Sequence, residues 1–280
     1  MNRLIADSGA SKTDWVLLGD GSPQFIQTEG LNPHLLTSGE FLKVLVNELK
    51  PNLLGRSVEE IRFFGSGCGS PEKKREVEQY LREVFEFAEI SVGTDLDAAG
   101  IALFGKESGL VGILGTGSSA AYFENGEVAD QMPSVGFPEG DEGSGSYIGK
   151  RIMKLYASGD LHMDLRYYLD HHVEEDIEKM TLMFKKTKEA KLFAGEICKV
   201  MGPKAHYPQI QQIIHDGFRI YLTKVKEHFP DEVASQDMSF VGSIASIFES
   251  ELRSECRQMG IEVGSVVRSP VEHLGLYFRG

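Results

Sequence analysis

The sequence predicts an α/β protein built from two similar halves, and three observations support this fold class. The chain opens with three short runs of β-branched and aromatic residues separated by turn signals, which is typical of a meander of strands. Strand-like runs then alternate with helical patterns, as they do in an α/β layer. After about residue 108 the opening pattern restarts, and a repeat of this length indicates a duplicated domain.

The first half is expected to contain five strands and three helices. The strands are expected at residues 3–7, 14–18, 24–28, 61–65 and 90–94. One helix is expected at 39–50. A second begins at Ser70–Pro71, where serine can cap the helix and proline fits its first turn. The third begins at Asp95, directly after the last strand.

The stretch between the first two strands, ADSGASKTDW at residues 6–15, places a lysine–threonine pair behind small residues, as a phosphate-binding P-loop does. The two glycine positions of a P-loop are held here by Ala6 and Ser11, and a strand-like run follows where a P-loop needs a helix. The stretch therefore predicts a hairpin whose tip is rich in glycine and serine.

The second half repeats this arrangement. Strand-like runs at 110–114 and 120–123 flank a second small-residue tip, GTGSS at 115–119, which corresponds to DSGAS at 7–11. The Asn-Gly pair that follows is typical of a hairpin turn. The remaining expected elements are a mostly helical region from Asp141 to about residue 228, a strand at 239–241, a helix after Gly242 and a last helix at about 270–279.

Composition and charge restrict the function classes. The 280 residues are 41% hydrophobic and 25% charged, as in a globular protein. A formal net charge of −13 argues against nucleic acid or an anionic membrane as partner, because both need clustered lysine and arginine. No apolar run approaches the roughly 20 residues of a membrane span. The first residues, MNRLIADSG, turn polar too soon for a signal peptide, and we expect a cytoplasmic protein.

The three cysteines, Cys68, Cys198 and Cys256, lie far apart in the chain without any C-x-x-C spacing. This spacing disfavours a zinc site and a disulfide framework. We expect three reduced and mostly buried thiols.

The two tips are candidate anion sites, because successive backbone N–H groups and hydroxyls in such turns can surround one anion. Two tips at equivalent places in duplicated halves are best explained by a ligand held between them, and a triphosphate carries charge at both ends. Asp7 lies at the base of the first tip, where the second has Gly115. A carboxylate beside a phosphate suits Mg²⁺ held through water. The alternative is that Asp7 only fixes the turn.

Three motifs carry a resemblance to a known superfamily. Residues 7–14 (DSGASKTD) resemble the first phosphate motif of the sugar kinase, heat-shock ATPase and actin superfamily. Residues 114–119 (LGTGSS) resemble its second, and residues 240–245 (FVGSIA) its nucleoside-side motif. Within the superfamily the chain is similar to the BadF/BadG/BcrA/BcrD ATPase family. That branch holds N-acetylglucosamine kinases and the ATPases that activate benzoyl-CoA reductase and 2-hydroxyacyl-CoA dehydratases.

The resemblance implies two ribonuclease-H-like domains of the actin-like ATPase type with a cleft between them. One would span 1–107, with the last helix (268–280) packed back on it, and the other 108–267. ATP is implied as cofactor together with Mg²⁺, which Asp7 would order through water. The phosphate ligands would be Gly9, Ser11, Lys12, Thr13, Gly115, Thr116, Gly117 and Ser118, and the nucleoside would lie by Gly242 and Ser243. Closure of the two domains would exclude water from the γ-phosphate.

The resemblance also supplies a catalytic base. A sugar kinase needs a carboxylate that accepts the proton of the attacking hydroxyl. In this branch the catalytic base resembles the aspartate of an Asp-Ala-Ala-Gly segment at the start of a helix. In this sequence that aspartate is Asp97. The alternative for Asp97 is a purely capping role at the helix N-terminus. Asp95, two residues earlier, is held as a reserve.

Sugar-binding residues are implied by two further segments. GLNP at 30–33 would place Asn32 on a sugar hydroxyl or acetamido group, and GDEGS at 140–144 would place Asp141 on sugar hydroxyls, with Gly136 beside them. The alternatives are a turn at Asn32 and a helix cap at Asp141. Amino-sugar kinases of the family often carry an aromatic residue where this chain has Val135; Phe137 is a nearby substitute.

Two rival functions fit the sequence less well. An activating ATPase would need cysteine ligands for an iron–sulfur cluster soon after the second tip, and no cysteine lies between Gly115 and Ile197. An actin-like filament or chaperone carries large insertions, for which 280 residues leave little room. The charged stretch 174–189 fits a partner surface or, more commonly, a solvated helix face.

The sequence therefore predicts a cytoplasmic, ATP- and Mg²⁺-dependent kinase of an amino sugar, with N-acetylglucosamine phosphorylated at its 6-hydroxyl. The sugar is the small-molecule partner. The choice among amino sugars and other hexoses is left open, and so are the partner-activating ATPase, an inactive relative and the oligomeric state, a homodimer included.

Overall fold

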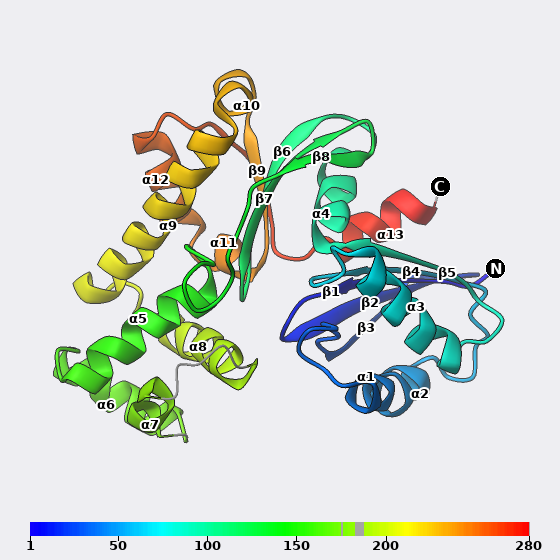
Figure 1. The fold of residues 1–280 in the computed structure, drawn as a ribbon, viewed down its shortest axis with the longest axis horizontal. Helices are drawn as coiled ribbons and strands as arrows, with labels where there is room; N and C mark the ends of the chain where they lie inside the picture. The colour runs from blue at the N-terminus through cyan, green and yellow to red at the C-terminus, as the bar shows by residue number, and fades with distance from the viewer. Residues whose placement is uncertain (175, 183–187, 280) are drawn as a thin grey trace. The chain divides into compact units, whose positions relative to one another are not determined.

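A computed structural model describes residues 1–174, 176–182 and 188–279 of the chain. The chain divides into two compact units (Figure 1). The first comprises Met1–Ser108, Phe123–Val128 and Ser269–Gly280, and the second Gly109–Tyr122 and Ala129–Arg268. Of the charged stretch 174–189, residues 175 and 183–187 lie outside the described residues.

The first sheet has five strands in the order β3-β2-β1-β4-β5. They are β1 (Arg3–Ser8), β2 (Lys12–Leu18), β3 (Gln24–Glu29), β4 (Glu60–Gly65) and β5 (Glu89–Thr94). The β1–β2 and β2–β3 pairs are antiparallel hairpins, whereas β4 lies parallel to β1 and β5 parallel to β4. The parallel pairs need crossovers, which the intervening helices provide.

Helices cover both faces of this sheet. One face packs on α1 (Ser38–Val44), the π-helical turn η1 (Leu45–Leu49), which leads into α2 (Lys50–Asn52), and α3 (Pro71–Val84). The other packs on α4 (Asp95–Phe104) and α13 (Val271–Arg279). Successive side chains along β1 point to opposite faces of the sheet. Leu4 and Ala6 face the first group of helices, and Ile5 faces α4 and α13.

The second sheet repeats the first. Its strands are β6 (Gly109–Leu114), β7 (Ser118–Glu124), β8 (Glu127–Gln131), β9 (Met238–Val241) and β10 (Val263–Val267). Their order is β8-β7-β6-β9-β10, with β9 parallel to both β6 and β10. In chain order this is the same 3-2-1-4-5 arrangement as in the first sheet. The predicted α/β fold with an internal duplication is therefore confirmed.

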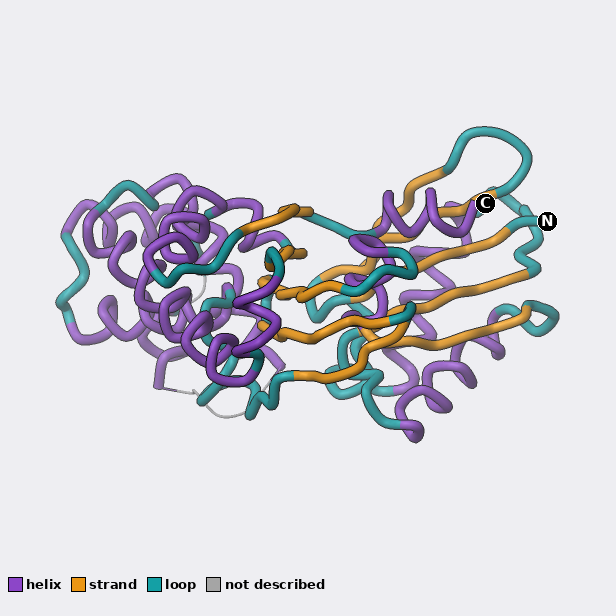
Figure 2. Tube along the Cα trace, turned by 90° about the horizontal axis from the view of Figure 1, so that it is seen from above, coloured by secondary structure: helices purple, strands orange, loops and turns teal. Residues whose placement is uncertain are grey.

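The second unit is largely helical between β8 and β9 (Figure 2). Its helices are α5 (Gly145–Ser158), α6 (Met163–His172), α7 (Ile177–Leu182), α8 (Lys188–Met201), η2 (Gly202–Lys204), α9 (Pro208–His228), α10 (Pro230–Ser235), α11 (Ser243–Ile247) and α12 (Glu249–Gln258). Helices α5 and α8 touch through their backbones, because a Cβ atom at Gly149 would lie 1.7 Å from the Ala194 carbonyl oxygen. Only glycine permits this approach.

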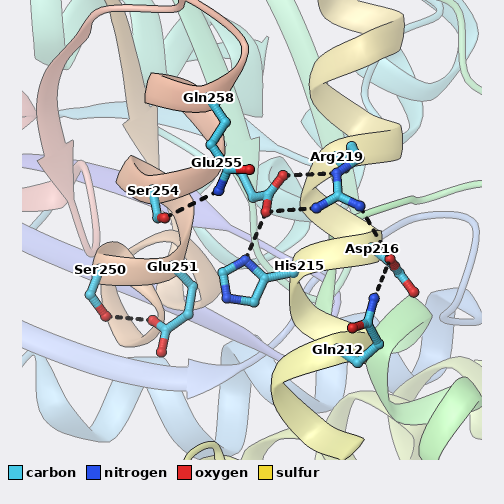
Figure 3. A network of polar contacts seen from close by, with 9 residues as sticks. All are labelled: Gln212, His215, Asp216, Arg219, Ser250, Glu251, Ser254, Glu255 and Gln258. Atoms are coloured by element: carbon cyan, nitrogen blue, oxygen red, sulfur yellow. Dashed lines mark hydrogen bonds and ion pairs between the residues drawn. The ribbon is translucent and has the colours of Figure 1, made fainter. Parts of the chain in front are cut away.

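A buried carboxylate joins α9 to α12 (Figure 3). Glu255 of α12 is almost fully buried and accepts hydrogen bonds from Nε and Nη2 of Arg219, each at 3.1 Å. The Nδ1 atom of His215, one turn earlier on α9, lies 2.9 Å from Glu255 Oε1. The hydrogen bond to Glu255 and its negative charge raise the pKa of Arg219.

Two sequence expectations need correction. The helix expected at 39–50 changes to a π-helical turn at Leu45–Leu49 and continues to Asn52. Strand β10 was not predicted, because its sequence VGSVV is short and contains glycine and serine. The expectation for the three cysteines is confirmed: all are free and buried. Among the described residues, no helix is long and apolar enough to cross a membrane.

Candidate functional site

The first tip, residues 9–13, is a tight turn between β1 and β2. Gly9 N donates a hydrogen bond to Lys12 O at 2.9 Å. Gly30 passes directly beneath the tip, and a Cβ atom there would lie 2.5 Å from the Ala10 carbonyl oxygen. Because glycine at position 30 has no Cβ atom, the chain that follows β3 can pack directly against the backbone of the tip.

The Thr13 hydroxyl supports the tip from within. Its side chain is buried, shares a 2.8 Å hydrogen bond with Ser8 Oγ and donates to Glu29 O at 3.1 Å. These hydrogen bonds hold the hydroxyl of Thr13 within the turn, against Ser8 and Glu29. Ser11, at the same tip, is exposed.

The Lys12 ammonium is paired within the same unit. Its Nζ atom donates to Asp14 Oδ2 at 2.6 Å, and Asp14 also accepts from Gln27 and Ser269. Burial alone would raise the pKa of Asp14, but the hydrogen bonds from Lys12, Gln27 and Ser269 lower it below its usual value. Lys12 thus lies beside the tip with a carboxylate already bound.

Asp7 lies near the end of β1, with other carboxylates close by. Burial, followed by the negative charges of Asp95 and Asp14, raises the pKa of Asp7 to about 7, while Lys12 lowers it. A bound cation would relieve this crowding. No group of three or more His, Cys, Asp or Glu residues that could hold a metal occurs in the part of the chain that the structure describes. The carboxylates gathered at Asp7 have the oxygen chemistry that Mg²⁺ prefers, and Asp7 is the residue that would hold it.

Asp97 has the capping role that the sequence left as its alternative. Thr94 and Asp97 form a capping box at the start of α4. Asp97 Oδ2 accepts from Thr94 N at 2.8 Å and from Thr94 Oγ1 at 2.9 Å, and Asp97 N donates to Thr94 Oγ1 at 3.1 Å. Asp95, the reserve residue, begins the same helix and is the α4 carboxylate whose charge acts on Asp7.

Asn32 is held in a turn of its own chain. Its Oδ1 atom accepts from His34 N at 2.9 Å, and its Nδ2 donates to Ser66 Oγ at 3.0 Å. Gly67 lies against it, since a Cβ atom there would be 2.6 Å from Asn32 Oδ1. The β4–α3 loop and the backbone of His34 therefore fix the orientation of the amide.

The second tip, residues 115–118, is supported by the start of α5. Gly115 N donates to Gly117 O at 2.9 Å. The carbonyl oxygens of Gly115 and Thr116 accept hydrogen bonds from Gly145 N and Ser146 N, at 2.8 and 3.2 Å. These backbone hydrogen bonds hold the second tip against the start of α5.

Asp141 lies directly on this tip. It is 5% exposed and has a positive φ of 58°, which is rare for a residue other than glycine. Its Oδ1 atom accepts from Ser118 N at 3.4 Å, and its Oδ2 lies 2.8 Å from Lys191 Nζ. Lys191 is far from this tip in the sequence, and the packing of α8 against α5 brings it there.

Gly136 lies in a compact turn that leads to Asp141. It has a φ of +67°, and its carbonyl oxygen accepts from Gly140 N at 2.7 Å. Val135, where an aromatic residue was expected, is 73% exposed. Phe137 packs against the core of the second unit instead.

Gly242 brings the third motif to the second tip. Its φ is +127°, and a Cβ atom there would lie 2.3 Å from the Leu114 carbonyl oxygen. Strand β9 can therefore turn into α11 directly beside the backbone that enters the tip. Ser243 is the first residue of α11.

Comparison with known proteins supports the fold. No protein-family model and no curated protein matches the chain. Among solved structures, it is similar to a protein of Porphyromonas gingivalis assigned as an N-acetylglucosamine kinase, with a TM-score of 0.87 and 26% identity over 99% of this chain and 98% of that one. A protein from Chromobacterium violaceum with the same assignment matches at 0.74 and 15% identity, over 99% and 98%.

A third similar structure is a ROK family glucokinase from Streptomyces griseus in complex with glucose and AMPPNP. Its TM-score is 0.64 and its identity 13%, over all of both chains. The chain has the fold of the sugar kinase, heat-shock ATPase and actin superfamily. The resemblance stated from three loose sequence motifs is thereby confirmed at the level of the fold.

Within this superfamily fold, each unit gathers part of the predicted site. In the first unit the fold brings together the first tip, Asp7 and Asp95. In the second it brings together the second tip, Asp141, Gly242 and the unpredicted Lys191.

Proposed function

We propose that this protein is an ATP-dependent kinase that phosphorylates an amino sugar, N-acetylglucosamine, at its 6-hydroxyl. The observation that carries the proposal is the match to the P. gingivalis protein, at a TM-score of 0.87 and 26% identity over nearly the whole of both chains. The order of the two phosphate tips and the nucleoside-side motif in the sequence supports it further.

The nucleotide would be bound mainly by backbone. The first tip offers Gly9, Ser11 and Lys12, and the second offers residues 115–118, while Gly242 and Ser243 would adjoin the nucleoside. Backbone N–H groups suit this task in a chain of net charge −13, because they attract phosphate without a positive overall field. Asp7 would hold Mg²⁺, which neutralises phosphate charge when bound.

We assign the catalytic base to Asp95 in place of Asp97. Asp97 Oδ2 already accepts two hydrogen bonds from Thr94 and fixes the start of α4. Asp95 is the first residue of the same helix, its Oδ1 atom accepts a hydrogen bond from Leu96 N at 3.1 Å, and its charge acts on Asp7. In the reaction, Asp95 would accept the proton of the 6-hydroxyl as the sugar oxygen bonds to the γ-phosphorus and the bond to ADP breaks. Asn32, Gly136 and Asp141 would contact the sugar.

The assignment is tested by the isosteric variants Asp95→Asn and Asp97→Asn. For Asp95→Asn, kcat should fall by about 10²–10⁴-fold, with ATP binding retained. Asp97→Asn should keep kcat within about tenfold and lower stability by ~1 kcal/mol, the typical effect of a weakened cap. Steady-state kinetics and thermal unfolding of both variants distinguish the two assignments. A larger loss of kcat in Asp97→Asn than in Asp95→Asn would show that Asp97 is the catalytic base.

The function itself is tested by Mg²⁺-dependent ADP release in the presence of glucose, glucosamine, N-acetylglucosamine, N-acetylmannosamine, N-acetylmuramic acid or no sugar. We expect N-acetylglucosamine to stimulate release most strongly. Greater stimulation by another sugar would keep the kinase and change its substrate. Slow release that no sugar alters would refute the kinase and favour an ATPase that acts on a partner protein.

The activating ATPase has little support in the cysteines. All three are buried, and burial raises the pKa of each thiol to about 12. Cluster ligands must be thiolates, which these surroundings disfavour.

A further inference from the structure

We propose that Lys191 binds the terminal phosphate of the nucleoside triphosphate at the second tip. The inference rests on the part of the proposed function that concerns ATP, and it is independent of the identity of the sugar. No motif of the sequence analysis includes this residue.

Helix α8 runs against the second tip, and two of its residues make the contact. A Cβ atom at Gly117 would lie 3.1 Å from Lys191 Nζ, and a Cβ atom at Gly195 would lie 3.2 Å from Thr116 Cγ2. Lys191 and Gly195 are four residues apart and therefore share one face of α8. Glycine at 195 lets the helix approach the tip, and the same approach brings the lysine ammonium to Gly117.

The charge at this place is unusual for a phosphate site. The Asp141 carboxylate lies in front of the tip, with Oδ1 3.4 Å from Ser118 N. An uncompensated carboxylate there would repel a phosphate. Lys191 Nζ, 2.8 Å from Oδ2, supplies the compensating charge, and its side chain is only 22% exposed.

Asp141 can use only part of the donor capacity of the Lys191 ammonium. Asp141 Oδ2 and Lys191 Nζ are at ion-pair distance, yet no hydrogen bond of acceptable geometry reaches this buried oxygen within the described part of the chain. A lysine ammonium has three N–H donors and no fixed plane. One ammonium can therefore contact Asp141 and a phosphate oxygen held at the tip amides.

The test is calorimetric binding of AMPPNP and of AMP to the purified protein with Mg²⁺ and without sugar. Replacing Lys191 by Met should weaken AMPPNP binding by about tenfold or more and leave AMP binding unchanged, since AMP lacks the terminal phosphate. Lys191→Arg, which keeps the positive charge, should lose less AMPPNP affinity than Lys191→Met does. The matched control is Lys199→Met, an exposed lysine on the same helix, which should bind both nucleotides as the wild type does.

A second variant guards against a folding defect, because Lys191→Met leaves Asp141 buried without its counter-ion. Asp141→Asn should tighten AMPPNP binding about threefold or more by removing a negative charge from the tip. Lys191→Met/Asp141→Asn, which buries no unpaired charge, should bind AMPPNP about tenfold more weakly than Asp141→Asn alone. Equal affinities in these last two proteins would overturn the role of Lys191. Failure of the wild type to bind AMPPNP would instead overturn the proposed ATP site as a whole.

Discussion

At the scale of single residues, the period of two along a strand decides which side chains can reach a ligand. In β2, Thr13 is on the same face as Trp15 and Leu17, which belong to the core under α1 and α3. Its hydroxyl is therefore turned inward, a result that the alternation alone could have predicted. Asp7 lies on the opposite face of the sheet, which packs on α4, and this position brings it near Asp95.

Glu60 shows how a buried charge couples stability to pH. It is 6% exposed and accepts hydrogen bonds from Arg3 Nε at 2.6 Å and Arg62 Nε at 2.7 Å. Burial alone would raise the pKa of Glu60, but the two arginines lower it below its usual value of 4.5. A carboxyl whose pKa is lowered in the folded state stabilises the fold above its unfolded value and loses that effect as pH falls.

We therefore predict that Glu60→Gln lowers the free energy of unfolding by ~1–3 kcal/mol at pH 7. The difference between the variant and the wild type should shrink as pH falls below 4.5, because the wild-type carboxyl then takes up its proton. Urea unfolding of both proteins at pH 7, 5 and 4 measures this difference. A difference that is constant over this range would contradict the argument.

At the scale of elements, glycines and caps set how closely segments meet. Gly149 joins α5 to α8, Gly30 supports the first tip and Gly242 adjoins the second, and in each case a Cβ atom would lie less than 3.0 Å from another backbone atom. The sequence predicted the strands that carry the tips, because hydrophobic alternation is local. It could not predict Lys191, since α8 reaches the tip only through packing against α5.

Helices α9 and α12 offer a test of a buried ion pair at this scale. Removing Glu255 by Glu255→Ala should lower the free energy of unfolding by ~2–4 kcal/mol, because His215 and Arg219 lose their common acceptor. The matched control is Glu249→Ala on the same helix, whose exposed pair with Arg253 should contribute less than ~1 kcal/mol. Equal losses in the two variants, measured by urea unfolding, would show that the buried cluster contributes no more than a surface pair.

At the scale of the whole molecule, the internal duplication is the feature that the sequence predicted best. Two small-residue tips, each preceded by a strand, were enough to indicate the duplication, because the strands flanking them alternate in the same way. The sugar is the part that neither the fold nor the motifs decide. Val135 is exposed, whereas Phe137 is partly buried against the core of the second unit.

The last helix ties the end of the chain to its beginning. In α13, Leu274 is fully buried in the core formed with Ile5, Val16 and Phe64, whereas Leu276 is 70% exposed. Leu274→Ala should therefore lower stability by ~2–5 kcal/mol, and Leu276→Ala should change it little. Hydrogen exchange locates the effect: protection should fall in β1, β2 and α4 of the first unit and stay unchanged in α9 and α12 of the second. Equal loss of protection in both units would mean that the two cores unfold as one.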